Sequence, residues 1–389
     1  MTMKKIIIVN NNMKVGGVQK SLYNLLWEIR GQYQVTLCLF SRTGAYLEQL
    51  PPEIKVIECG SLFRYLGISQ GECSGLDKVK RGALAFLCRI FGRPAVIKLL
   101  CASQKRLPEE YDCAIAFLQN GRKQNFYGGV QDFVLRRVNA KRKVAFLHCD
   151  YRNCGANHPD NNRLLAQFDR VAACSDGCRR AFEEVLPELA GNCQTVRNCH
   201  RFDEISALAA REPIQYDSNQ IHVITVARLA HEKGIERAIS AAAKARDAGM
   251  PIVLHIVGSG AMEQSLRELT REMGMTENVV FYGEQANPYR YMANADLFLL
   301  TSYHEAAPMV IEEAACLGLP VLTVQTTSSR EMVTQRGIGW VCENHQNGLD
   351  AGLLAVLRDV DLKEMKDRLR SQSVDNTIAA EQFRRVVEG

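Results

Sequence analysis

Two cations stand at a predicted strand end in the C-terminal half of the chain. Arg228 and Lys233 lie five residues apart in the loop that follows the predicted strand 221–227. A guanidinium offers a planar fork of donors and an ammonium a mobile point charge, so together they suit a diphosphate group. The alternative interpretation is a pair of solvated surface cations.

Two carboxylates follow another predicted strand of the C-terminal half, at 297–300. Pro308 suits the first turn of a helix, so Glu305 is predicted in the loop before that helix and Glu313 inside it. A carboxylate placed like Glu313 is able to accept two hydrogen bonds from a vicinal diol such as a ribose. The alternative is a capping residue followed by a glutamate on the helix surface.

A glycine pair stands between the first predicted strand, 5–9, and the first predicted helix, 18–30. Gly16 and Gly17 let a ligand approach the backbone, and the N–H groups at a helix N-terminus favour an anion. A Gly-Gly turn without a ligand is the alternative.

Other familiar motifs are incomplete. Gly258-Ser-Gly260 follows a strand and opens a helix, but Glu263 stands where a dinucleotide fingerprint needs its third glycine. No Gly-x4-Gly-Lys-Ser/Thr phosphate loop is present. The His-Glu dipeptides that begin at 231 and 304 lack the second histidine of a zinc-protease helix. These observations argue against a dinucleotide oxidoreductase, a P-loop enzyme and a zinc protease.

We expect no metal and no cofactor. Asp359 and Asp361 have the spacing of a metal–diphosphate pair, but they stand beside a polar helix and are predicted to be a helix cap or a solvated face. The six cysteines between 149 and 199 lack the paired spacing of a zinc site. All 14 cysteines are interpreted as reduced thiols of a cytosolic protein, since no secretory signal is recognised.

The predicted strands and helices that must position these residues fall into two groups along the chain. The chain has 389 residues, 47% of them hydrophobic and 23% charged, which predicts a globular protein of two domains. Strands alternate with helices up to residue 205 and again after a predicted linker at 201–220. This α/β pattern predicts two doubly wound parallel sheets, with ligands at the carboxyl ends of the strands. The predicted domains are 1–205 and 206–372, with a C-terminal helix at 373–389 that completes the first.

Charge divides the two halves. Residues 1–205 hold 30 Lys and Arg against 19 Asp and Glu, a net of +11, whereas 206–389 hold 18 against 24, a net of −6. The segment 78–106 carries eight cations, no acidic residue and many apolar side chains. A basic amphipathic segment suits an anionic membrane surface, although a helix with a cationic solvent face is the alternative. Nucleic acid is not an expected partner, because no aromatic side chains interleave with the charges as a stacking platform.

Together these motifs resemble the family-4 retaining glycosyltransferases of GT-B architecture, with two Rossmann-like domains facing a central cleft. The resemblance covers nearly the whole chain. It is strongest across 221–325, where Arg-x4-Lys-Gly, Gly-x-Gly, Phe-Tyr-Gly and Glu-x7-Glu follow in the family's order and spacing. In the N-terminal half it includes the Gly-Gly turn, Phe146-Leu-His148 and Asn198 with Phe202-Asp203.

The resemblance implies a role for each candidate residue. Arg228 and Lys233 would hold the donor diphosphate, Glu305 would lie near the donor sugar, and His148 would contact it. The implied donor-binding residues are Gly16, Gly17, Tyr282, Gln285, Ala306, Ala307, Pro308, Met309 and Glu313. Among them Glu313 would bind the ribose, and Tyr282 and Gln285 would border the nucleobase. Ala306-Ala307 replaces the family's frequent Gly-Phe, which changes the pocket wall and bears on donor identity.

The resemblance implies a metal-independent, retaining hexosyltransferase with an N-terminal acceptor domain and a C-terminal donor domain. It would move a sugar from a nucleotide-diphosphate sugar, with UDP favoured, to a glycan or polyprenyl-linked acceptor in cell-surface polysaccharide synthesis. The protein would be cytoplasmic and peripheral to the inner face of the cell membrane. The alternatives are a GT-B nucleotide-sugar epimerase, which would need an acid/base pair around the sugar, and an inactive nucleotide-sugar-binding scaffold.

Overall fold

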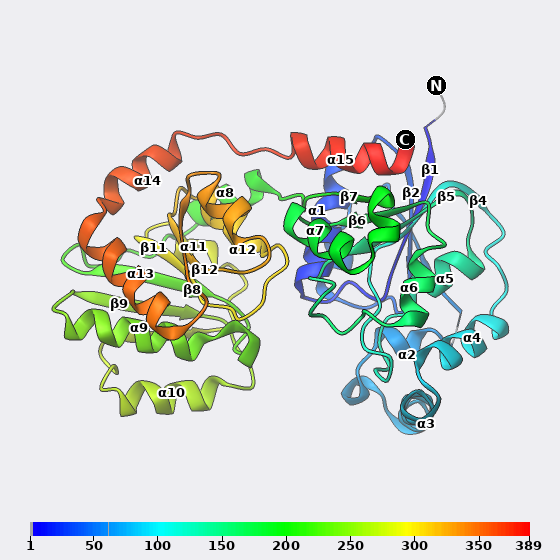
Figure 1. Cartoon of the computed structure of the whole chain (residues 1–389), viewed down its shortest axis with the longest axis horizontal. Coiled ribbons are helices and arrows are strands. Elements are labelled where there is room, and N and C mark those ends of the chain that lie inside the picture. The colour runs from blue at the N-terminus through cyan, green and yellow to red at the C-terminus, as the bar shows by residue number, and fades with distance from the viewer. Residues whose placement is uncertain (1–2, 61) are drawn as a thin grey trace. The chain divides into compact units, whose positions relative to one another are not determined.

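The chain folds into two compact α/β units, described here from a computed structural model that covers residues 3–60 and 62–389 (Figure 1). The first unit extends to Cys199 and includes Asn376–Gly389, and the second is His200–Asp375. The domain boundaries proposed from the sequence, near 205 and 372, lie a few residues from these divisions. The α/β class with two parallel sheets is confirmed.

The sheet of the first unit has seven parallel strands in the order β3-β2-β1-β4-β5-β6-β7. The chain builds outward from β1 to β3 and then crosses back to β4 on the other side of β1. The carboxyl ends of β1 and β4 therefore flank the switch point, where doubly wound sheets bind ligands. The strands are β1 Lys5–Asn10, β2 Gln34–Leu39, β3 Lys55–Glu58, β4 Glu110–Ala116, β5 Asn139–Leu147, β6 Arg170–Ala173 and β7 Cys193–Thr195.

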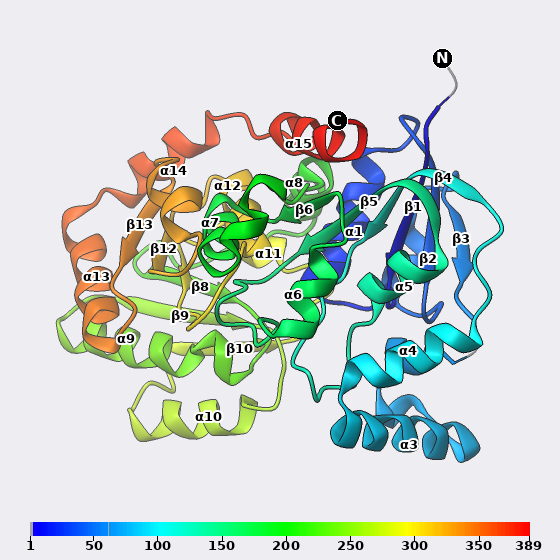
Figure 2. The same cartoon turned by 45° about the vertical axis from the view of Figure 1, so that its right-hand side comes forward.

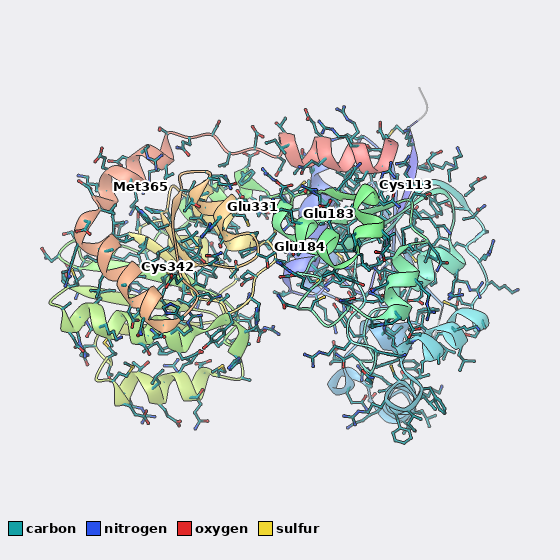
Figure 3. The ribbon with its side chains drawn as sticks, in the orientation of Figure 1. Cys113, Glu183, Glu184, Glu331, Cys342 and Met365 are labelled. Carbon is teal, nitrogen blue, oxygen red and sulfur yellow. The ribbon has the colours of Figure 1, made fainter. Side chains whose placement is uncertain are left out.

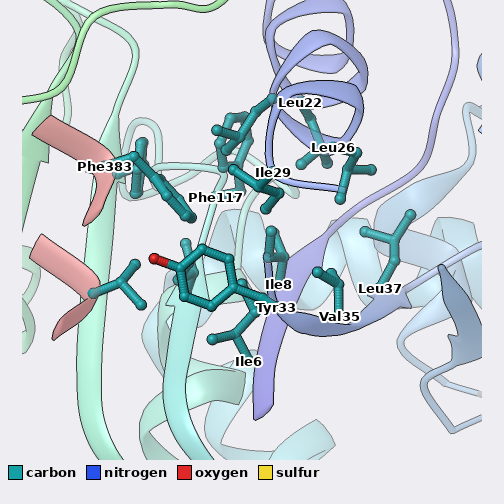
Figure 4. Packing of buried hydrophobic residues seen from close by; sticks show 14 of the residues in the cluster. Ile6, Ile8, Leu22, Leu26, Ile29, Tyr33, Val35, Leu37, Phe117 and Phe383 are labelled. Atoms are coloured by element: carbon teal, nitrogen blue, oxygen red, sulfur yellow. The ribbon is translucent and has the colours of Figure 1, made fainter. Parts of the chain in front are cut away.

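The core of the first unit joins its central strands to helices from both ends of the chain. Ile6 and Ile8 of β1 pack with Leu22 and Leu26, as an uninterrupted apolar strand buried on both faces should (Figure 4). Phe383 packs edge-on against the Tyr33 ring at 6.1 Å, so the C-terminal helix belongs to this core. The helices are α1 Gly17–Glu28, α2 Arg64–Gly67, α3 Gly75–Phe91, α4 Arg93–Ser103, α5 Val130–Arg137, α6 Pro159–Leu165, α7 Asp176–Val185 and α15 Thr377–Glu388.

The sheet of the second unit has six parallel strands in the order β10-β9-β8-β11-β12-β13. Its switch point lies between β8 and β11, which pair directly. The strands are β8 Ile221–Val226, β9 Ile252–Val257, β10 Val279–Gly283, β11 Leu297–Leu300, β12 Val321–Val324 and β13 Gly339–Cys342. The helices are α8 Phe202–Ala210, α9 Ile235–Asp247, α10 Glu263–Glu272, α11 Tyr289–Met292, α12 Met309–Cys316, α13 Gln346–Asp359 and α14 Leu362–Arg370.

The predicted linker at 201–220 is wrong over its first half. α8 occupies 202–210, and Ile205 and Ala209, one helical turn apart, are buried against the second sheet. The remainder is irregular but packed, since the Tyr216 hydroxyl donates to the backbone carbonyl of Tyr291 at 2.9 Å. The segment is therefore part of the second unit.

The predicted basic segment 78–106 is two helices, α3 and α4, separated at Gly92. Gly92 adopts φ 79°, a left-handed value that favours glycine. The turn places Arg93 at the start of α4 with its side chain 1% exposed, facing Asp132 of α5. Arg93 is thus a buried ion-pair partner, and its inclusion among the surface cations is wrong.

Candidate functional site

The loops after β8 and β11 meet at the switch point of the second sheet. Leu297 and Val223 are register partners in the β8–β11 pair, so the two strands end at the same edge. A Cβ on Gly234 would lie 2.5 Å from the carbonyl oxygen of Thr301, so glycine lets the two loops touch. The Thr301 hydroxyl also donates to the Gly234 carbonyl at 2.8 Å.

The structure joins two of the predicted site residues directly. Lys233 Nζ donates to Glu305 Oε1 at 2.7 Å, and the two side chains are 26% and 11% exposed. The residues lie 72 positions apart in the sequence and at the ends of neighbouring strands. The carboxylate fixes the position of the ammonium and balances part of its charge, and the ammonium has further N–H donors for a second acceptor.

Arg228 lies in the same loop, on its solvent side. Its guanidinium pairs with Glu232, and 71% of its side chain is exposed. An exposed pair of this kind contributes little to stability. Arg228 is therefore available to a ligand at low cost, but the structure does not bring it into the Lys233–Glu305 pair.

The loop after β11 leads into α12, and the helix begins next to Pro308, as the sequence predicted. Pro308 is buried and precedes the first helical residue, Met309, while Ala306 and Ala307 lie in the loop behind Glu305. Glu313 is inside α12 and only 2% exposed. The prediction that one carboxylate precedes the helix and the other lies within it is confirmed.

Arg237 of α9 supports this loop and was missed by the sequence analysis. It is 4% exposed, and its Nη1 donates to the Thr301 carbonyl at 3.2 Å and to Asn344 Oδ1 at 2.8 Å. Its guanidinium also lies 4.8 Å from the centre of the Tyr303 ring. A helix arginine resembles a solvated surface residue in the sequence, so its role becomes visible only in three dimensions.

Tyr282 and Gln285 lie together at the end of β10. Gln285 Nε2 donates to the Tyr282 carbonyl at 2.7 Å, and Gln285 Oε1 accepts from the Tyr291 hydroxyl at 3.1 Å. Both ends of the Gln285 amide are thereby held. The ring centres of Tyr282 and Tyr291 are 4.4 Å apart, so Tyr282 and Gln285 rest on a pair of packed aromatic rings.

Behind Tyr282 runs a buried hydrogen-bond chain that the sequence analysis did not identify. His222 Nε2 lies 2.8 Å from the Asp217 carbonyl, so it carries a proton, and His222 Nδ1 then accepts from His255 Nε2 at 2.9 Å. His255 Nδ1 is left to accept from the Tyr282 hydroxyl at 3.1 Å. The sequence did contain one indication of this chain: His222 and His255 each stand within an otherwise apolar strand, and the two strands are neighbours.

This chain requires a neutral His255, which makes stability depend on pH. Burial, followed by the nearby His222, lowers the pKa of His255 to about 4. Between this value and the ordinary histidine pKa, unfolded chains bind a proton that the folded chain excludes, so stability falls as pH falls. We expect His255 to lower the free energy of unfolding of its unit by about 2 kcal/mol between pH 7.5 and pH 5.

Urea unfolding of the wild type and of His255→Gln at both pH values tests this expectation. Glutamine retains hydrogen-bonding capacity without titrating, so the acid-induced loss should shrink by about 2 kcal/mol. His345→Gln, at an exposed position, serves as the control and should retain the full loss. An unchanged pH dependence in His255→Gln would contradict the assignment.

In the first unit, the glycine pair opens α1 beside the switch point. The helix begins at Gly17, and its first turn contains no acidic residue. Gly17 is exposed and a Cβ there would meet nothing within 4 Å, so the space beside its α-carbon is open. Gly16 is extended at φ 171°, and a Cβ there would lie 2.7 Å from Gln19 Oε1. Backbone N–H groups at a helix N-terminus of this kind favour an anion.

His148 follows β5 and lies against the rings of Phe117 and Phe146, at 4.6 and 5.9 Å. Its Nε2 is shielded from solvent and has no hydrogen-bond partner among the described residues. Burial lowers the pKa of His148 to about 4, and a hydrogen bond to the Phe117 backbone opposes this only in part. The imidazole is therefore neutral at physiological pH, with a bare nitrogen able to accept a hydrogen bond.

The loop that carries His148 is tethered to α7. Arg152 Nη1 donates to Glu184 at 2.8 Å, and the neighbouring Glu183 accepts from Arg179 at 2.7 Å; both glutamates are labelled on α7 in Figure 3. The Arg152–Glu184 contact links the loop after β5 to α7, whereas the Arg179–Glu183 contact lies within α7.

Three further expectations concern the rest of the described chain. Asp361 caps α14 by accepting from the Glu364 backbone N–H at 2.9 Å, so its interpretation as a helix cap is confirmed. Within residues 3–60 and 62–389, no group of three or more His, Cys, Asp or Glu side chains is arranged to hold a metal ion. None of the described helices combines the length and apolarity needed to cross a bilayer.

Comparison with known proteins links most of the second unit to a family model. Residues 208–373 match the model of the family described as glycosyl transferases group 1. A Campylobacter jejuni N-acetylgalactosaminyltransferase that acts on a diphospho-undecaprenol-linked sugar is 28% identical over 188 residues, 47% of this chain and 50% of that protein. The lipopolysaccharide core glycosyltransferase LpsD of Rhizobium meliloti is 29% identical over 41% of this chain and 45% of its own length. The chain thus spans about half the length of these curated relatives.

Solved structures match over almost the full length of both chains. Anabaena HepE in complex with UDP and glucose has a TM-score of 0.67 at 21% identity, covering 99% of this chain and 100% of that one. The lipopolysaccharide outer core galactosyltransferase WaaB has a TM-score of 0.63 at 15% identity, covering 99% of each. The chain therefore has the GT-B fold, and its residues 208–373 are similar to the glycosyl transferases group 1 family.

Proposed function

We propose that the protein is a family-4-type retaining glycosyltransferase that moves a sugar from a UDP-sugar to a glycan or lipid-linked acceptor in cell-surface polysaccharide synthesis. The observation that carries the proposal is the Lys233–Glu305 pair at the switch point of the domain that matches the glycosyltransferase family. The first unit binds the acceptor and the second binds the donor.

Departure of a nucleoside diphosphate builds negative charge on its phosphates. Lys233 and Arg228 stabilise this charge in place of a metal ion. The N–H groups at the start of α1, beside Gly17, donate hydrogen bonds to a phosphate group. The backbone and side chains of 306–309 line the donor beside Glu305. Retention follows from front-side displacement, in which the leaving phosphate accepts the proton of the acceptor hydroxyl.

The remaining site residues orient the donor. Glu313 binds the ribose hydroxyls, and Tyr282 with Gln285 borders the base. The bare Nε2 of His148 accepts a hydrogen bond from a hydroxyl of the transferred sugar, which its neutral form makes possible at pH 7. Glu305 holds Lys233 in position and lies near the sugar.

The relatives support the choice of donor and acceptor class. The Anabaena structure contains UDP and glucose, and the Campylobacter relative is named for a diphospho-undecaprenol-linked acceptor. Two relatives from different bacteria are thus associated with a uridine diphosphate and with a lipid-linked sugar, the two substrates proposed for this chain.

Thermal stabilisation against a panel of nucleoside diphosphates tests the donor site. At 100 times its dissociation constant, UDP is expected to add about 2.7 kcal/mol of stability, visible as a raised melting temperature. The increase should be the same with magnesium and with EDTA. UMP is the control and should give a smaller increase, because it lacks the phosphate that meets Lys233. No shift with any nucleoside diphosphate would contradict the proposed function.

A further inference from the structure

α3 presents an apolar stripe to solvent. Leu76, Val79, Phe86 and Ile90 are 76%, 68%, 61% and 57% exposed. Together with Ala83 they recur at intervals of three and four residues, which aligns them along one helix face. Phe91 and Leu99 add to the same region, so six of the twelve exposed large hydrophobic side chains of residues 3–60 and 62–389 fall between 76 and 99. The stripe is a property of this helix and not of the surface in general.

The opposite face of α3 attaches the helix to the first unit. Cys88 is buried, and Asp77 accepts from Arg64 at 2.9 Å and from the Tyr65 hydroxyl at 2.7 Å. Arg81 Nε donates to the Ile68 carbonyl at 2.9 Å. The apolar stripe is therefore not needed for packing within the chain.

Cations flank the stripe. Lys78 and Arg89 lie along one side of it by helical geometry and Lys80 along the other, and all three are exposed. No acidic residue occurs from 78 to 106. An apolar stripe bordered by lysine and arginine matches the interface of an anionic bilayer, where acyl chains receive the stripe and headgroups the cations.

α3 and α4 are anchored to the ligand-binding edge of the first sheet. Asn12, after β1, donates through Nδ2 to the Gly67 carbonyl of α2 at 2.6 Å. The Arg93 N–H at the start of α4 donates to the Lys123 carbonyl, in the loop after β4, at 2.7 Å. Both sides of the switch point thus contact this region, and α3 lies at the outer edge of the unit, beyond α2 and α4 (Figures 1 and 2).

We propose that α3 docks on the surface of a bilayer that contains anionic lipids, with Leu76, Val79, Phe86 and Ile90 inserted among the headgroups. Docking holds the carboxyl edge of the first sheet at the lipid surface. The acceptor that reaches this edge is therefore a glycan attached to a lipid. The choice of acceptor rests on the proposed function, whereas docking itself does not.

Flotation of the full chain with vesicles of equal phosphatidylglycerol and phosphatidylcholine measures docking. The wild type should float at 50 mM salt, much less at 1 M salt, and little with phosphatidylcholine alone. Phe86→Ser combined with Ile90→Ser should weaken partitioning about 100-fold, because both side chains leave water on docking. Ile378→Ser is the matched control, since Ile378 is 56% exposed on α15, and it should float as the wild type does.

The cations are tested by Lys78→Gln, Lys80→Gln and Arg89→Gln together. At about fivefold per charge, the triple variant should bind the anionic vesicles about 100-fold more weakly. Lys363→Gln, at an exposed position of α14, is the control and should bind normally. If flotation is unchanged both in the triple variant and at 1 M salt, the electrostatic part of the proposal is wrong.

Two other outcomes would overturn docking itself. One is unchanged flotation of the Phe86/Ile90 variant. The other is a concentration-dependent self-association, seen by sedimentation velocity and abolished in that variant, which would assign the stripe to a second copy of the chain. The acceptor claim has its own readout: the variant should lose transfer to a lipid-linked acceptor in vesicles but keep transfer to a short water-soluble acceptor. A chain that floats yet is not stabilised by any nucleotide would refute the proposed function and leave docking intact.

Discussion

Lys233→Ala is expected to lower kcat/KM for glycosyl transfer by about 10²–10³-fold while changing the melting temperature little. The ammonium faces charge that develops on the departing diphosphate, so its loss is felt most in the transition state. Its pair with Glu305 is partly exposed, at 26% and 11%, and such pairs contribute modestly to folding. Steady-state kinetics with a UDP-sugar, beside thermal unfolding of the same preparations, separates the two effects.

Lys244→Ala is the matched control for this substitution. Lys244 is also an ion-paired lysine of the second unit, with Asp350 as its partner, but it lies within α9 and away from the switch-point loops. Its removal should leave kcat/KM unchanged. A Lys233→Ala enzyme within twofold of the wild type would refute the diphosphate assignment.

Glu305→Gln distinguishes the two members of the pair. Glutamine still accepts a hydrogen bond from Lys233 but no longer balances its charge, so binding of UDP alone should be retained or strengthened. Turnover should fall, because the carboxylate near the sugar is lost. Equal loss of UDP binding and turnover would show that Glu305 serves only to hold Lys233.

Local patterns in the sequence were sufficient to predict most of the strands, although not their order in the two sheets. The apolar runs at 252–257 and 297–300 coincide with β9 and β11, since a buried parallel strand needs an uninterrupted apolar segment. Pro308 marked the start of α12 because proline is favoured where a helix begins. The short β13 at Gly339–Cys342 was not predicted, because a four-residue segment that starts with glycine has no clear strand pattern.

Contacts between residues far apart in the sequence could not be predicted from such patterns. Nothing in the spacing of His222, His255 and Tyr282 states that their side chains form one hydrogen-bond chain, since that depends on strand register and rotamers. Arg93 illustrates the opposite error. In the sequence it is one of eight cations in a basic segment, but the turn at Gly92 directs it into the protein against Asp132.

That buried pair leads to the second large effect: Asp132→Asn is expected to destabilise the first unit by about 3–5 kcal/mol. Arg93 and Asp132 side chains are 1% and 7% exposed, with Nη1 and Oδ2 3.4 Å apart. The substitution leaves a buried guanidinium without its counter-charge, and arginine does not release its proton to escape the penalty. Urea unfolding of the wild type and the variant measures the loss.

The Arg93–Asp132 pair also stabilises the loop after β4, so its loss should destabilise that loop as well. Asn120 donates to Asp132 at 3.3 Å and to Asn161 at 2.9 Å, and it accepts from the Gly129 N–H at 2.8 Å. Loss of the carboxylate charge therefore weakens the contacts that Asp132 makes with Arg93 of α4 and with Asn120, the side chain that also binds α6 and the Gly129 N–H. Hydrogen exchange in 118–129 should accelerate in Asp132→Asn before global unfolding is reached.

The reciprocal substitution separates charge from packing. Arg93→Met leaves a carboxyl group whose pKa burial already raises, so protonation relieves the unpaired charge and the loss should be smaller than in Asp132→Asn, and smaller at pH 5 than at pH 7.5. Replacing both partners, with Arg93→Met and Asp132→Leu, removes both charges and should recover most of the stability. If the double variant is as unstable as Asp132→Asn, then packing volume and not the ion pair holds α4 to α5. A loss below about 1 kcal/mol in Asp132→Asn itself would mean that solvent reaches the pair in solution.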